Sequence, residues 1–218
     1  MIKCVIFDCD GLMFDSEKIS IEVWKRIGKK YGFNFDEEFF TGITGSGKGQ
    51  AKKQFDRYPG ISDILPEIRA ERDRSIFEKA HTTGIAKKGL TVLLDYLNKN
   101  NYLVCAGSSS PYSYVAELIS TLDKPYHFDY ICCGDMVTKC KPDPEIFLNC
   151  AKALNVEPEN CLVLEDSKNG IIAAKNAGMI SGFIYDTVSK DEQFSHLIDH
   201  EFQDLSQVID YLKDQTNA

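Results

Sequence analysis

Two aspartates separated by one residue stand near the start of the sequence, directly after a short apolar run. They belong to the segment Asp8-Cys9-Asp10-Gly11, which follows the run Cys4–Phe7. Two carboxylates this close repel each other unless a cation or a shared proton lies between them. A solvent-exposed acidic turn is the simpler interpretation, because Asp-Gly is a common turn pair. Taken alone, the segment leaves both a catalytic pair and an exposed turn open.

Two further polar segments carry groups that suit an anion. Gly107-Ser108-Ser109-Ser110-Pro111 follows an apolar run, and the backbone N–H groups and hydroxyls of such a segment can bind an anion at a helix start. A plain helix N-cap explains this segment equally well. In Lys139-Cys140-Lys141-Pro142, Lys141 can hold an ammonium in a site or be solvated like most loop lysines, and we assign Lys139 to the solvent.

A fourth polar segment, Glu165-Asp166, follows the apolar run Cys161–Leu164. Adjacent carboxylates at the end of a buried strand are costly without a cation, and hard oxygen ligands suit Mg²⁺. An exposed acidic turn is the alternative. The segment therefore indicates either a metal site or a solvated loop.

The elements that must position these residues are short apolar strands, each followed by helical periodicity. We expect strands at Cys4–Phe7, Tyr102–Ala106, Tyr130–Cys133, Cys161–Leu164 and Gly182–Tyr185. Strands that are apolar on both faces favour a parallel sheet covered by helices. The sequence thus predicts an α/β fold with a doubly wound parallel sheet, in which chemistry belongs at the carboxyl ends of the strands.

The segment after the first strand differs in kind from the rest of the chain. Ile19, Val23, Trp24 and Ile27 follow helical spacing, and no convincing strand appears before residue 84. We therefore expect a small helical cap domain at residues 15–82, inserted into an α/β core domain formed by residues 1–14 and 83–218.

Composition limits the classes of partner and compartment. The net charge of −8 argues against the broad basic surface that nucleic-acid binding requires. No window approaches the length of a membrane helix, and the early Asp8 excludes a signal peptide. Eight cysteines without a Cys-x-x-Cys pair favour reduced thiols. We expect a soluble cytoplasmic protein, a monomer or weak homodimer, with no nucleic-acid or membrane partner.

A glycine-rich stretch within the insertion imitates a nucleotide-binding loop. Residues 42–49 satisfy Gly-x-x-x-x-Gly-Lys, but Gly49 stands where the loop needs a Ser or Thr for Mg²⁺, and no convincing strand precedes it. A flexible cap loop that brings Lys48 to the substrate is the better interpretation. A turn with a solvated lysine stays open.

The four polar segments, in this order and each after an expected strand, resemble the motifs of the haloacid dehalogenase superfamily of hydrolases. The resemblance spans essentially the whole chain. It is strongest to the subgroup with a helical cap after the first motif, which includes phosphoglycolate-phosphatase-like enzymes and β-phosphoglucomutase.

Catalytic roles follow from this resemblance. It implies that Asp8 attacks phosphorus to form an aspartyl-phosphate and that Asp10 acts as general acid and then as general base. Ser108 would hydrogen-bond the phosphoryl group, and Lys141 would neutralise its charge. Such neutralisation is a physical necessity, because an anionic nucleophile must approach an anionic phosphoryl group.

Ligand-binding roles follow in the same way. The resemblance implies Mg²⁺ on the side chains of Asp8 and Asp166 and on the backbone carbonyl of Asp10, with Glu165 as a second ligand or orienting group. We also expect Gly11 and Ser109 to contribute to substrate binding, together with the Lys48 named above.

The expected activity is Mg²⁺-dependent hydrolysis of a small soluble phosphate monoester, such as a sugar phosphate or a nucleotide-like ester. The alternative is a phosphomutase of the β-phosphoglucomutase type. Ser20 stands where the mutase pattern has a histidine, and Gly45 where it has an arginine, so we favour the phosphatase. A binding module that has lost catalysis is the third possibility, and the intact Asp8, Asp10 and Lys141 argue against it.

Overall fold

A parallel sheet forms the centre of the protein in the computed structural model, which describes residues 1–43, 48–185 and 192–216. Its strand order is β3-β2-β1-β4-β5-β6. The strands are β1 (Cys4–Phe7), β2 (Leu103–Ser108), β3 (Tyr130–Cys133), β4 (Cys161–Glu165), β5 (Ile180–Ile184) and β6 (His200–Phe202). The chain winds outward from β1 in both directions, so the topological switch point lies between β1 and β4, where such sheets bind ligands.

Helices cover both faces of this sheet because successive strand side chains point to opposite faces. Val5 and Phe7 pack with helices α5 (Leu90–Lys99), α6 (Tyr112–Ser120) and α10 (Val208–Thr216). Cys4 and Ile6 pack on the other face with α7 (Glu145–Ala153) and α8 (Lys168–Asn176). The short helix α9 (Glu192–Ser195) and the 3-10 turns η1 (Pro158–Asn160) and η2 (Leu205–Gln207) complete this part of the fold.

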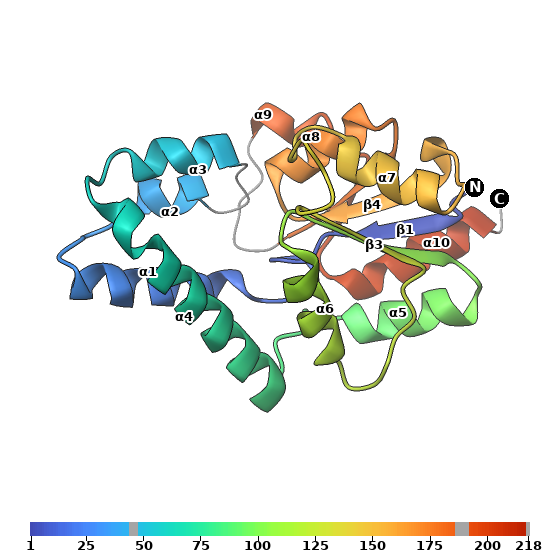
Figure 1. Cartoon of the computed structure of the whole chain (residues 1–218). Coiled ribbons are helices and arrows are strands. Elements are labelled where there is room, and N and C mark those ends of the chain that lie inside the picture. Colours follow the sequence, from blue (N-terminus) through green and yellow to red (C-terminus); the bar gives the residue numbers. More distant parts are fainter. Residues whose placement is uncertain (44–47, 186–191, 217–218) are drawn as a thin grey trace.

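Four helices between β1 and α5 form a separate group beside the sheet (Figure 1). They are α1 (Glu17–Lys30), α2 (Glu37–Ile43), α3 (Lys48–Phe55) and α4 (Ile61–Thr82). Their own apolar cluster centres on Trp24, whose ring stacks on Phe55 with the centroids 5.8 Å apart. The second half of α4 leaves this group, because Ile76 and Ala80 pack into the core beneath the sheet. The domain limits at residues 14/15 and 82/83 stay a prediction.

The predicted doubly wound α/β fold is confirmed, and β1 and β3 have the expected limits. β2 begins one residue later than expected and continues to Ser108, and the strand expected at 182–185 spans Ile180–Ile184. Strand β6 was missed, because a three-residue edge strand carries too little periodicity to be recognised.

The cysteines and the helix lengths add two facts about the whole molecule. All eight cysteines are free, and seven of them are buried. Across residues 1–43, 48–185 and 192–216, no helix combines the length and hydropathy that a membrane span requires.

Candidate active site

The carboxyl ends of three neighbouring strands bring the polar segments together. Asp8 follows β1, Ser108 ends β2, and Glu165 ends β4. Since β1 lies between β2 and β4 with parallel registers, these three positions meet at one edge of the sheet. Residues that are distant in the chain therefore share one site.

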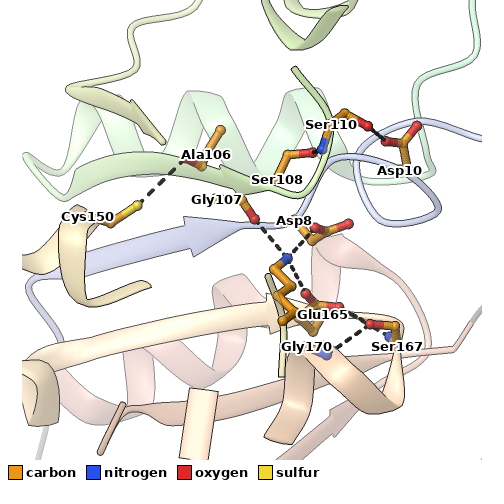
Figure 2. Close-up of polar contacts among 11 residues, drawn as sticks. Asp8, Asp10, Ala106, Gly107, Ser108, Ser110, Cys150, Glu165, Ser167 and Gly170 are labelled. Atoms are coloured by element: carbon orange, nitrogen blue, oxygen red, sulfur yellow. Dashed lines mark hydrogen bonds and ion pairs between the residues drawn. The ribbon is translucent and has the colours of Figure 1, made fainter. Parts of the chain in front are cut away.

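Lys141 is the centre of the buried polar contacts at this edge. Its ammonium Nζ lies 2.5 Å from Oδ1 of Asp8 and 2.6 Å from Oε1 of Glu165. It also donates to the backbone carbonyl of Gly107 at 2.9 Å (Figure 2). All three ammonium protons thus have acceptors, and the lysine is fixed against the carboxylate of Asp8.

Burial and charge shift the pKa values of this pair. Burial raises the pKa of Asp8 to about 8, although Lys141 opposes this shift. Burial also disfavours a charged Lys141, but Asp8 and Glu165 outweigh it and raise the pKa of the ammonium above its ordinary value. Lys141 therefore remains a cation beside the Asp8 carboxyl group at neutral pH.

Three buried carboxyl groups form a cluster that fits a divalent cation. Asp8, Glu165 and Asp166 each offer an oxygen atom, and these atoms lie within 4.8 Å of one another. When all three groups are ionised, Lys141 offsets one of their negative charges. A divalent cation would balance the remaining two, and carboxylate oxygens are the ligands that Mg²⁺ takes.

Two glycines allow these acids to approach. Gly11 has φ +83°, and a Cβ atom there would lie 2.1 Å from Oδ2 of Asp166. A Cβ atom on Gly170, at the start of α8, would lie 1.8 Å from the carboxyl carbon of Glu165. Gly11 thus has a packing reason for its place in the motif, and its expected contact with substrate stays a prediction.

Glu165 is held on its other side by the start of α8. The backbone N–H and the hydroxyl of Ser167 donate to Oε2 of Glu165, at 3.2 and 2.9 Å. The Ser167 hydroxyl also caps α8 by accepting from the N–H of Gly170 (Figure 2). The carboxylate of Glu165 is therefore oriented by Lys141 and Ser167 together.

Asp10 is held by three hydroxyl groups. Ser16 and Tyr114 donate to its Oδ1 at 2.6 and 2.8 Å. Ser110 donates to Oδ2 at 2.6 Å (Figure 2). Sequence reasoning missed all three contacts. Ser110 lay in a motif that was recognised, whereas nothing local in the sequence pointed to Ser16 or Tyr114.

The remaining predicted site residues lie in different surroundings. Ser108 is buried, and its Oγ accepts a hydrogen bond of 3.1 Å from the N–H of Ser110. Ser109 is exposed and lines the cavity described below. Lys48 begins α3, but its side chain lies outside the described residues.

Helix α2, rather than a strand, leads into the glycine-rich stretch at residues 42–49. This agrees with the rejection of a nucleotide-binding loop, which needs a preceding strand.

A cavity of about 570 Å³ lies between helices α1 to α4, which we call the cap, and the edge of the sheet. Its volume is within the range of small-molecule sites. The core contributes hydroxyl and carboxyl groups. The cap contributes aromatic rings and three cationic side chains. Among the residues that line it are Asp10, Ser109, Ser110 and Tyr114 from the core, and Ser20, Trp24, Lys52, Phe55, Arg69 and Arg72 from the cap.

Known proteins resemble this chain in sequence and in fold. Residues 5–184 match the haloacid dehalogenase-like hydrolase family. Phosphorylated carbohydrates phosphatase from Thermotoga maritima is 30% identical over 181 residues, which cover 82% of this chain and 82% of that protein. β-Phosphoglucomutase from Bacillus subtilis is 28% identical over 188 residues, covering 83% and 82%. The crystal structure of β-phosphoglucomutase from Clostridium difficile has the same fold, with a TM-score of 0.79 at 24% identity, and covers 100% of this chain and 98% of that one.

The chain belongs to the haloacid dehalogenase-like hydrolase family, since the family match covers most of its length. Within this family it is an enzyme of the phosphohydrolase type. The resemblance drawn from the four motifs is confirmed.

Proposed function

We propose that this enzyme is a Mg²⁺-dependent phosphatase that hydrolyses a small phosphate monoester, most simply a phosphorylated sugar, through an aspartyl-phosphate on Asp8. The observation that carries the proposal is the fixed Asp8–Lys141 pair next to the buried acids Glu165 and Asp166. A carboxylate held against an ammonium and close to a cation site can attack an anionic phosphoryl group.

Each residue of the site has a task in this proposal. Asp8 displaces the leaving oxygen from phosphorus, and Asp10 gives that oxygen a proton. Asp10 then takes a proton from the water that releases phosphate from Asp8. Lys141 keeps the charge of the nucleophile neutralised, and Ser108 hydrogen-bonds the phosphoryl group. Mg²⁺, held by Asp8, Asp166 and the Asp10 carbonyl with Glu165 beside them, supplies further charge neutralisation when bound.

The cavity supports a sugar phosphate as the substrate. Its aromatic rings, Trp24 and Phe55, suit the apolar face of a sugar, and Arg69 and Lys52 suit its oxygen atoms. The relative from Thermotoga maritima, a phosphatase of phosphorylated carbohydrates, supports the same class. We therefore propose phosphorylated sugars ahead of nucleotide-like esters.

A phosphomutase of the β-phosphoglucomutase type is the second candidate, because one of the relatives is named as that enzyme. In a mutase a second sugar hydroxyl, rather than water, accepts the phosphoryl group. Ser20 lines the cavity where the mutase pattern places a histidine, which favours the phosphatase. Gly45, the other departure from the mutase pattern, lies outside the described residues.

We also propose that the enzyme acts in the cytoplasm as a monomer or weak homodimer. The buried, unpaired cysteines support a reducing compartment. Size-exclusion chromatography with light scattering would test the oligomeric state.

The function can be tested by measuring phosphate release from a panel of phosphorylated metabolites with Mg²⁺. We expect hydrolysis of one or more sugar monophosphates without a bisphosphate activator, and its loss in Asp8→Asn. Isomerisation of β-glucose 1-phosphate would overturn the phosphatase in favour of the mutase. Unchanged hydrolysis of p-nitrophenyl phosphate by Asp8→Asn would show that Asp8 is not the nucleophile.

A further inference from the structure

Tyr114 links the cap helix α4 to the Asp10 carboxylate. Its hydroxyl donates to Oδ1 of Asp10 at 2.8 Å, and the residue is only 5% exposed. Tyr114 belongs to α6, whereas Asp10 follows β1, so the contact joins two segments of the core beneath the cavity. A buried tyrosine hydroxyl usually has a hydrogen-bond partner, and here that partner is the carboxylate proposed as acid and base.

The three hydroxyl groups around Asp10 differ in how firmly they are placed. The hydroxyls of Ser16 and Ser110 depend on side-chain torsions that can change without moving the backbone. The oxygen of Tyr114 lies on the axis of a rigid ring, so its position is set wherever the ring is packed. Tyr114 is therefore the donor that best defines the orientation of the Asp10 carboxyl group.

The ring of Tyr114 is packed by α4. The ring centroid of Phe77 lies 5.4 Å from that of Tyr114, and the guanidinium carbon of Arg72 lies over the Tyr114 ring, 5.7 Å from its centroid. Arg72 is fixed in turn, because its Nε and Nη2 donate to Oδ1 of Asp73 at 2.9 and 2.6 Å. The contacts thus run from α4 through the Tyr114 ring to Asp10.

We propose that Tyr114 is a positioning residue for Asp10, and that α4 holds it in place through Phe77 and Arg72. The proposal rests on the proposed role of Asp10 as general acid. As the bond between phosphorus and the leaving oxygen breaks, the proton on Asp10 passes to that oxygen while Asp8 keeps the phosphoryl group. A misdirected Asp10 impairs this transfer most where the leaving group is a poor one.

The experiment compares two esters in Tyr114→Phe, which removes only the hydroxyl. We measure kcat/KM, which covers the steps up to release of the leaving group, for the best sugar phosphate and for p-nitrophenyl phosphate. We expect a loss of about tenfold or more with the sugar phosphate, whose alkoxide needs protonation. The loss with p-nitrophenyl phosphate should be under about threefold, because its leaving group departs without a proton.

Two further variants make the test specific. Tyr112→Phe is the matched control, since Tyr112 lies on the same helix but is 48% exposed, and we expect both esters to be unaffected. Phe77→Leu keeps the Tyr114 hydroxyl but loosens its ring, and should give a weaker form of the same ester-selective loss. Thermal unfolding would reveal whether Tyr114→Phe folds. If it does not fold, Phe77→Leu provides the test in its place.

The outcomes separate this inference from the proposed function. Equal losses on both esters, or no loss on either, would overturn the positioning role while leaving the phosphatase in place. A wild-type enzyme inactive on every ester would instead refute the proposed function itself.

Discussion

At the scale of single residues, burial separates two lysines that lie two positions apart. Lys141 is 6% exposed and contacts Asp8 and Glu165, and its Nζ lies 4.7 Å from the ring centroid of Phe147. Lys139 is 70% exposed and pairs with Asp143 at 3.4 Å. A buried charge that loses its partner is costly, whereas a surface pair contributes little.

We therefore predict unequal effects of Lys141→Met and Lys139→Met on stability. Lys141→Met leaves two buried carboxyl groups without their cation and should lower the free energy of unfolding by about 3 kcal/mol. Lys139→Met should lower it by less than about 1 kcal/mol. Urea denaturation of the two variants beside the wild type, in metal-free buffer, measures both values. Similar losses in the two variants would contradict the assignment of Lys141 as the buried partner.

At the scale of elements, the loop between β3 and α7 must be rigid to present Lys141. Glu145, the first residue of α7, accepts hydrogen bonds from the N–H and the hydroxyl of Thr138, at 2.9 and 2.8 Å. It also accepts from the N–H of Lys139 at 2.8 Å. One carboxylate thus closes the loop that carries Lys141 into the site.

The hydrogen bonds that Glu145 accepts predict a pH-dependent contribution to stability. The N–H of Thr138 and the other donors lower the pKa of Glu145 below its ordinary value of 4.5. A carboxyl group with a lowered folded-state pKa stabilises the protein fully above 4.5, and this contribution is lost as the pH falls through the lowered value. The stability difference between wild type and Glu145→Gln should therefore be constant from pH 7 to about 5 and shrink at lower pH.

Chemical denaturation at a series of pH values measures this difference. Glu159→Gln, an exposed acid on η1, is the control for loss of one negative charge. A stability difference that persists unchanged at pH 3 would show that the Glu145 carboxylate does not hold the loop.

At the scale of the whole molecule, metal binding is coupled to folding. Asp8 lies just after β1, whereas Glu165 and Asp166 lie at the end of β4, far away in the chain, so the cluster exists only in the folded protein. A ligand that binds only the folded state raises the free energy of unfolding by RT ln(1 + L/Kd), where L is the free ligand concentration. Mg²⁺ binding should therefore raise the melting temperature of the whole protein.

We predict that Mg²⁺ at tenfold excess over its dissociation constant raises the free energy of unfolding by about 1.4 kcal/mol. For a chain of this length, that corresponds to an increase in Tm of about 3 to 6 °C. Excess EDTA should reverse the shift, and Asp166→Asn should abolish it, as scanning calorimetry would show. Asp210→Asn, at an exposed acid on α10, should retain the shift. A wild-type Tm that does not change when Mg²⁺ is added would count against the metal site.

Much of the fold was predictable from local patterns in the chain. Apolar runs such as Cys4–Phe7 and Cys161–Leu164 are buried on both faces, so their composition alone indicated a parallel sheet. Because parallel strands end at one edge, the order of the motifs also predicted that Asp8, Ser108 and Glu165 would meet. The three-residue β6 offered no such pattern.

The sequence by itself therefore determined the class of fold, the family and the polar segments of the site. Only the tertiary structure decided that Tyr114 and Ser16 hold Asp10, that α4 packs on Tyr114, and that a cavity lies between the cap and the core. The physical reason is that these contacts join residues from different elements. Their distances depend on how helices pack against the sheet, which no local periodicity or spacing encodes.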